Sequence, residues 1–414
     1  MNHTGSGEEY RPGSEILVEK TQARSLPLLA ITRMGDHAFE RSHHSSHGRV
    51  SFQEARAEGR AVQVFDEGKI VMRLPMPRGP VSGALFERLT RPPHRFDLPP
   101  VPAGKSSLEN EDLQLALFVC YELHYQGFDE VDEGWEWDPS LLAARQILER
   151  RLEDDLTQAV SHPFPVPSAR PLLTLPMRMR RTLVDLVSAA DDGSCLATFL
   201  EKKADLEQFR EFVTHRSIYH LKEGDPHTWA IPRLRGRAKA ALVEIQADEY
   251  GGGRLERMHS ELFRATMRAL DLDDSYGAYL DRVPAITLAL SNVMSLFGLH
   301  RRHRGALLGH LAAFEMTSSI PNRRYSRGLR RLGGDAAARR FYDEHVRADA
   351  VHEQIAAHDM CGGFAASHPA LSGDVLYGAA CALALDRLFA EHVLRRWTHG
   401  ATSLREADLM VGSR

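Results

Sequence analysis

The sequence predicts an all-α protein, in which a helical bundle (residues 108–405) follows an N-terminal extension (residues 1–107). Apolar residues of the later region recur every three and four positions, which is the period of an amphipathic helix. The same region holds no convincing alternation of polar and apolar residues, the pattern of a strand. The helical patterns also end at clear stops: Gly224-Asp225-Pro226, Ile320-Pro321-Asn322 and Gly333-Gly334.

The extension reads differently from the bundle. It contains two short strand-like runs (residues 61–65 and 69–74), followed by proline-rich breakers. His43, His44 and His47 lie among Ser, Gly and Arg residues, which do not form a dry metal site. We therefore expect a partly disordered extension in which these histidines belong to a solvated loop.

The expected helices follow one another with short connections, and no repeat of 20–50 residues is evident. Each is assigned from the recurrence of apolar residues at helical spacing. They cover residues 111–125, 141–160, 179–192, 206–223, 236–250, 255–272, 276–300, 304–319, 335–358 and 372–397.

Composition argues against several classes of protein. The net charge of −4 offers no basic excess for general nucleic-acid binding. No stretch approaches the roughly 20 apolar residues that span a bilayer, and the N-terminus lacks the pattern of a signal peptide. The four cysteines form no CxxC pair, so neither a zinc ribbon nor a disulfide framework is indicated. We expect a cytoplasmic protein with no membrane or nucleic-acid partner.

One helix carries three ligand-type residues on an inward face. Around a helix, Asp349 lies about 40° from His345, and His352 lies about 20° from it. They share that face with Phe341 and Ile355. A single buried histidine is usually a hydrogen-bonded core residue, but three such groups in register need partners.

Other predicted helices repeat this anomaly. Glu315 ends an apolar stripe, and Glu249 does the same on another helix. His259 lies beside apolar residues with Glu256 one turn earlier, and Glu223 follows Phe212 and Tyr219. Each of these fits a helix end or a surface position when taken alone. Together they supply carboxylates and imidazoles from several helices, which is typical of a dinuclear iron or manganese site in a bundle.

Competing motifs are weaker. His352 and His358 resemble a zincin motif, but the spacing is two residues too long and places the two imidazoles about 120° apart. No GxSxG elbow, Walker loop or strand-linked GxGxxG occurs. The Gly-rich run 251–254 follows a helix, so we expect it to break the helix between Glu249 and His259 rather than to cradle phosphate.

The set formed by Glu223, Glu249, His259, Glu315 and the H-x3-D-x2-H of His345, Asp349 and His352 resembles the ligands of the haem-oxygenase-like diiron oxidases and oxygenases. The order and spacing are most similar to the N-oxygenating members. HTWAIPRL and the run 372–397 add to the resemblance, which covers residues 108–400.

The resemblance implies a seven-helix bundle with two irons, bound as Fe(II), that activate dioxygen. Glu249 would be the extra carboxylate of the N-oxygenating group. Also implied are a small-molecule substrate, such as an amine or amino acid, an external electron donor, and often a homodimer. N-oxygenation, desaturation and C–C cleavage all stay open, because the same ligand set supports each of them.

Two alternatives also remain. Glu223, Glu256-x-x-His259, Glu315 and Asp349-x-x-His352 also satisfy a ferritin-like pattern, in which Glu256 replaces Glu249. A non-catalytic helical protein that stores, senses or merely binds metal, or one whose polar residues are structural, is the alternative of another class.

Overall fold

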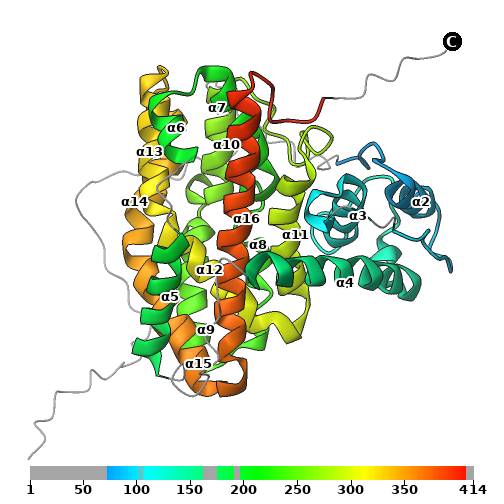
Figure 1. Ribbon diagram of the computed structural model, residues 1–414, viewed down its shortest axis with the longest axis horizontal. Helices are drawn as coiled ribbons and strands as arrows, with labels where there is room; N and C mark the ends of the chain where they lie inside the picture. The colour runs from blue at the N-terminus through cyan, green and yellow to red at the C-terminus, as the bar shows by residue number, and fades with distance from the viewer. Residues whose placement is uncertain (1–71, 102–103, 105, 162–174, 191–195, 407–414) are drawn as a thin grey trace, which may run out of the picture. The chain divides into compact units, whose positions relative to one another are not determined.

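The structure is a computed structural model that describes residues 72–101, 104, 106–161, 175–190 and 196–406. All regular secondary structure in these residues is helical, which confirms the predicted all-α class (Figure 1). The strand-like run 61–65 lies outside the described residues, as do His43, His44, His47 and Cys195. Met72–Leu74, at the end of the second run, has no regular structure.

Short helices and 3-10 turns connect the longer helices. The α-helices are α2 (Pro80–Leu89), α3 (Glu111–Glu122), α4 (Pro139–Ser161), α5 (Pro176–Ala190), α6 (Leu196–Lys202), α7 (Leu206–His220), α8 (Asp225–Thr228), α9 (Gly236–Glu249), α10 (His259–Ala269), α11 (Ala285–Leu299), α12 (Arg304–Thr317), α13 (Ser319–Arg331), α14 (Ala336–Gln354), α15 (Gly363–Ser367) and α16 (Ser372–Thr398). The 3-10 turns are η1 (Ser107–Glu109), η2 (Glu133–Trp137), η4 (Ile231–Arg233), η5 (Gly251–Gly253), η6 (Leu255–Arg257), η7 (Arg301–His303) and η9 (Pro369–Leu371), and η8 (Ile355–Gly362) is a π-helical stretch.

Several helix boundaries differ from the expected ones, and α2, α6 and α13 were not among the expected helices. At two helices the difference has an identifiable reason. The helix expected from residue 276 begins only at Ala285, because Pro284 in an extended conformation caps it. The helix expected to reach residue 358 changes from α to π geometry after Gln354. Such stretches are rare and recur at functional sites.

The helices that surround the candidate site pack at close range. α14 packs on α10 and α13, and α12 packs along α16 (Figure 1). A Cβ atom at Gly309 of α12 would overlap the carbonyl of Val375, and one at Gly378 of α16 would overlap that of Ala306. These glycines therefore let the two backbones approach one another directly.

Helices α2 and α3 pack together near the N-terminal end of the described chain. Asp112 of α3 accepts hydrogen bonds from the backbone N–H groups of Val81 and Ser82, at 2.9 and 2.7 Å. This carboxylate caps the first turn of α2 from a neighbouring helix, because the N-cap residue Gly79 has no side chain to do so. Helix α2 lies before the boundary expected near residue 107.

None of the described helices is both long enough and apolar enough to cross a membrane.

Candidate metal centre

Glu223 is placed by a turn between two helices. Helix α7 begins with a capping box, in which Asp205 and Gln208 satisfy each other's backbone N–H groups. It ends at His220, and a turn follows in which Gly224 has a φ of 90°. A Cβ there would come within 3.3 Å of the Glu249 side chain, so glycine lets this turn lie against the end of α9. The Glu223 carboxylate is buried and accepts a hydrogen bond from His220 Nδ1 at 2.7 Å.

Glu249 and His259 are brought together by the glycine run. Helix α9 ends at Glu249, and Gly251, Gly252 and Gly253 follow with φ values of 62°, 62° and 77°. Only glycine adopts this conformation freely at three successive positions. The chain reverses, and α10 begins at His259, whose Nδ1 lies 3.1 Å from Glu249 Oε2. The expected break of the helix is therefore confirmed.

Helix α14 contributes two imidazoles. His345 Nδ1 lies 2.9 Å from the Phe341 carbonyl one turn earlier, so it donates to that oxygen. The other nitrogen, Nε2, faces Glu223 Oε1 at 3.7 Å. His352 lies two turns further on, and its Nδ1 is 3.4 Å from Glu315 Oε2. Asp349 lies between them in the helix, but its side chain is outside the described part of the structure.

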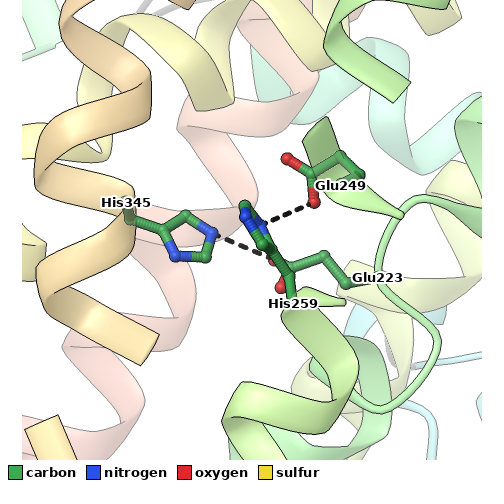
Figure 2. A group of neighbouring side chains, drawn as sticks. All are labelled: Glu223, Glu249, His259 and His345. Carbon is green, nitrogen blue, oxygen red and sulfur yellow. Dashed lines mark ion pairs between the residues drawn. The ribbon is translucent and has the colours of Figure 1, made fainter. Parts of the chain in front are cut away.

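These residues form two groups that share one carboxylate. Glu223, Glu249, His259 and His345 can each offer a ligand atom within 4.8 Å of the others, and so can Glu249, Glu315 and His352. Figure 2 shows the first group, with side chains from α9, α10, α14 and the turn after α7 converging on one point. The structure thus brings together six of the seven residues expected from the sequence. Glu249 stands between the two groups.

Several buried ligand atoms have no hydrogen-bond partner. Glu223 Oε2, Glu249 Oε2, His259 Nδ1 and His352 Nδ1 are all buried and make no hydrogen bond. His259 Nδ1 and Glu249 Oε2 are close, yet their geometry is not that of a hydrogen bond. Leaving buried polar atoms unpaired costs about 1–3 kcal/mol each. Oxygen and imidazole ligands converging in this way suit iron or manganese, so the residues fit a pair of divalent cations.

Electrostatics within the groups favour bound positive charge. Burial disfavours the ionised form of Glu223, but His220 and His345 outweigh it and hold the pKa of this carboxyl well below its usual range. Burial likewise disfavours protonated His352, but Glu315 and Asp248 raise its pKa to about 9. In the metal-free protein, a proton on His352 therefore supplies positive charge that a metal ion would supply when bound.

Two contacts around the ligands were not identified from the sequence. Asp248, which is 63% exposed at its side chain, accepts a hydrogen bond from His352 Nε2 at 2.9 Å. His220 contacts Glu223 as described above. Carboxylates behind metal-binding histidines fix the tautomer and orientation of the ring. Asp248 could not be found from apolar periodicity, because it lies on the polar face of α9. The contact between His220 and Glu223 could have been predicted, because residues three apart lie on the same side of a helix.

Glu256, the ligand of the ferritin-like alternative, lies in η6 and is exposed. It belongs to neither group of converging ligand atoms. The structure therefore does not assemble the alternative ligand set.

The described residues thus combine packed helices with two carboxylate–histidine groups that share one glutamate and could hold metal ions. Residues 210–387 match the family described as "Iron-containing redox enzyme", the haem-oxygenase-like family that the sequence resembles. This match confirms the resemblance, and it spans all seven expected ligands. This part of the chain is thus similar to a family of iron-containing redox enzymes.

Part of the chain is also similar to a curated protein with a named activity. "Nitrosourea synthase" from Streptomyces achromogenes subsp. streptozoticus is 26% identical over 136 residues, which is 33% of this chain and 29% of that protein. The similarity thus spans less than a third of the length of that relative.

Proposed function

We propose that this protein is a non-haem diiron oxygenase or oxidase that activates dioxygen and acts on a small amine or amino-acid-type metabolite. The observation that carries the proposal is the position of Glu249 in both groups of ligand atoms. A carboxylate has two oxygens and can bridge two metal ions, as in other dinuclear carboxylate sites of helical bundles.

The two groups assign the ligands. Glu223, His259 and His345 would hold one iron, Glu315 and His352 would hold the other, and Glu249 would be shared. Asp349 is proposed as a further ligand from its position in α14. When bound, the two irons supply electrons to dioxygen and generate the oxidant.

The chain's own residues orient the ligands and exclude water. The Phe341 carbonyl holds the proton of His345 on Nδ1, which leaves Nε2 to face the site. Asp248 does the same for His352 by accepting from Nε2. The Phe341 ring lies 4.4 Å from the His345 ring and 5.0 Å from that of Phe263, and both phenylalanines are fully buried. This apolar wall protects a reactive oxidant from water.

N-oxygenation in specialised metabolism is the preferred reaction. One line of support is the similarity to nitrosourea synthase. The other is the buried Glu249, which corresponds to the extra carboxylate that the resemblance assigns to the N-oxygenating members. Desaturation and C–C cleavage by the same centre are the second candidates. An external electron donor and a homodimer are proposed with this function.

Oxygen uptake by iron-loaded protein tests this proposal. Metal-free protein would be loaded anaerobically with two equivalents of Fe(II) and mixed with dioxygen in a stopped-flow spectrometer. We expect rapid oxygen consumption with a transient visible absorption, lost in Glu315→Ala and His345→Ala and retained in the control Glu256→Ala. Iron binding without oxygen consumption would instead favour a non-catalytic metal-binding protein.

The substrate class is tested separately by adding amines, amino acids and fatty acids to the same mixture. An amine or amino acid that speeds the decay of the transient absorption and yields an N-hydroxylated product supports the preferred reaction. A product with a new C=C bond or a cleaved C–C bond would replace it by one of the second candidates.

A further inference from the structure

A buried ion pair joins the turn that carries Glu223 to helix α3. Lys222 Nζ is 2.9 Å from Glu122 Oε2, and the two side chains are 1% and 0% exposed. Tyr276 donates a hydrogen bond to the same carboxylate oxygen at 2.7 Å. Lys222 and Glu223 are adjacent in the chain, so the ion pair and the metal ligand share one stretch of backbone.

Aromatic rings enclose the ammonium group. Lys222 Nζ lies 4.9 Å from the ring centre of Phe118, 4.4 Å from that of Tyr125 and 5.9 Å from that of Tyr276. Cation–π contacts of this kind strengthen when water is excluded. Lys222 is therefore fixed by a charge and by aromatic rings, most of them from α3 and the turn that follows it.

The opposite side of the turn is tied to α9. Gln246 Nε2 donates to the Gly224 carbonyl at 2.7 Å, and Tyr250 OH donates to Asp225 at 2.7 Å. Both donors flank Glu249 in the sequence. The Glu223 backbone is thus held between α3 on one side and the helix that carries Glu249 on the other.

Stability alone does not account for this ion pair. Removing two charges from water costs several kcal/mol per ion, and replacing a buried pair by apolar residues is often neutral or stabilising. Such pairs can instead fix one arrangement of the chain. Glu122 also lies outside residues 210–387, the region that matches the redox-enzyme family.

We propose that the Lys222–Glu122 ion pair is a positioning device that sets where Glu223 lies relative to Glu249, and thereby sets the iron affinity of the first ligand group. This inference rests on the proposed diiron function. It assigns α3 a role in the metal centre, although none of the expected ligands comes from that helix.

The test is a paired substitution, Lys222→Met/Glu122→Gln, in the full-length protein. It removes both charges, methionine fills the aromatic cage, and glutamine still accepts from Tyr276. The matched control is Arg145→Met/Glu149→Gln. That ion pair is also buried, at 3.1 Å, and its carboxylate likewise accepts from a tyrosine, Tyr121, but it does not adjoin a ligand turn. A single Lys222→Met substitution is avoided, because it would leave the buried Glu122 carboxylate without a positive charge beside it.

Two readouts that do not require turnover would be compared, namely anaerobic Fe(II) titration and the absorption spectrum of Co(II)-loaded protein. We expect the Fe(II) affinity of the group formed by Glu223, Glu249, His259 and His345 to fall about 10- to 100-fold in the Lys222/Glu122 variant. Replacing residues that orient metal ligands has effects of this size. Its Co(II) spectrum should change, and the control should keep the wild-type affinity and spectrum.

Wild-type affinity and spectrum in the Lys222/Glu122 variant would overturn the inference. So would an equal loss in the control, because that would reflect general loosening of the fold. Failure of the wild-type protein to bind metal would instead overturn the proposed function, so the two failures are distinguishable.

Discussion

Asp248, at the protein surface, accepts a hydrogen bond from the expected metal ligand His352. Its carboxylate is 63% exposed, and the His352 ring to which it is bonded is buried. Because the bond holds the proton of His352 on Nε2, it leaves Nδ1 for a metal ion. This pairing depends on how α9 packs against α14. The apolar periodicity that predicted the other site residues identifies polar groups on buried faces only.

Asp248→Asn tests that role. We expect about 10- to 100-fold weaker Fe(II) binding at the group of Glu249, Glu315 and His352, with little change in folding stability, because an exposed amide replaces an exposed carboxylate. Glu244→Gln, one turn earlier on the exposed face of α9, is the control and should bind iron like wild type. Equal Fe(II) affinities in the two variants would show that Asp248 has no role in metal binding.

The pKa of His352 predicts how iron binding responds to pH. With its pKa raised to about 9, His352 is protonated at neutral pH in the metal-free protein, and Fe(II) must displace that proton. Affinity for Fe(II) should therefore rise with pH, by about tenfold per unit for one proton, and level off near pH 9. Anaerobic titrations between pH 6 and 9 measure this slope. A slope of zero would contradict the displacement of a His352 proton by Fe(II).

At the scale of elements, the turn after α9 shows what the sequence could predict. Three consecutive glycines indicated a broken helix, and the structure confirms the break. The direction of the reversal, which places His259 beside Glu249, depends on the packing of η6 and α10 and has no local signal. The π-helical stretch after α14 was also not predictable, because the sequence there keeps ordinary helical spacing and the stretch lies against α5 and α9.

Two glycine substitutions separate strain from close packing in that turn. Gly251→Ala combines a φ of 62° with a Cβ that would lie 2.5 Å from the Arg257 carbonyl carbon. Gly252→Ala has the same φ, but its Cβ would meet nothing within 4 Å. We expect Gly252→Ala to lower the free energy of unfolding by about 1–2 kcal/mol and to keep iron binding.

Gly251→Ala should cost more stability than Gly252→Ala and should weaken iron binding, because the displaced chain separates His259 from Glu249. Urea unfolding and Fe(II) titration of the two variants measure both effects. Similar losses in the two proteins would contradict the packing argument.

At the scale of the whole molecule, the sequence predicted an all-α fold and a ligand set spread over several helices, and these helices meet as expected. It did not predict that α3 would reach the ligand turn. Lys222 and Glu122 are 100 residues apart, and neither interrupts a hydrophobic pattern in a way that indicates its partner. Tertiary packing determines long-range pairs of this kind, and local periodicity carries no information about which distant residues meet.

Metal binding should stabilise the whole fold, because the ligands converge only in the folded chain. A ligand at 100 times its dissociation constant adds about 2.7 kcal/mol to the free energy of unfolding. Anaerobic Fe(II) should therefore raise the Tm of the metal-free protein by several degrees, and a chelator should reverse the shift. Glu249→Ala should show a much smaller shift, since it removes the shared carboxylate. An unchanged Tm in wild type would contradict the convergence of these residues on metal.

The central claim is that Glu249 joins two irons into one centre, and Mössbauer spectroscopy of protein loaded with 57Fe and exposed to dioxygen tests it most directly. We expect two irons per chain whose ferric spins couple, so that the spectrum at low temperature shows no magnetic splitting in a weak field. A magnetically split spectrum of isolated high-spin ferric ions, or a single iron per chain, would contradict it.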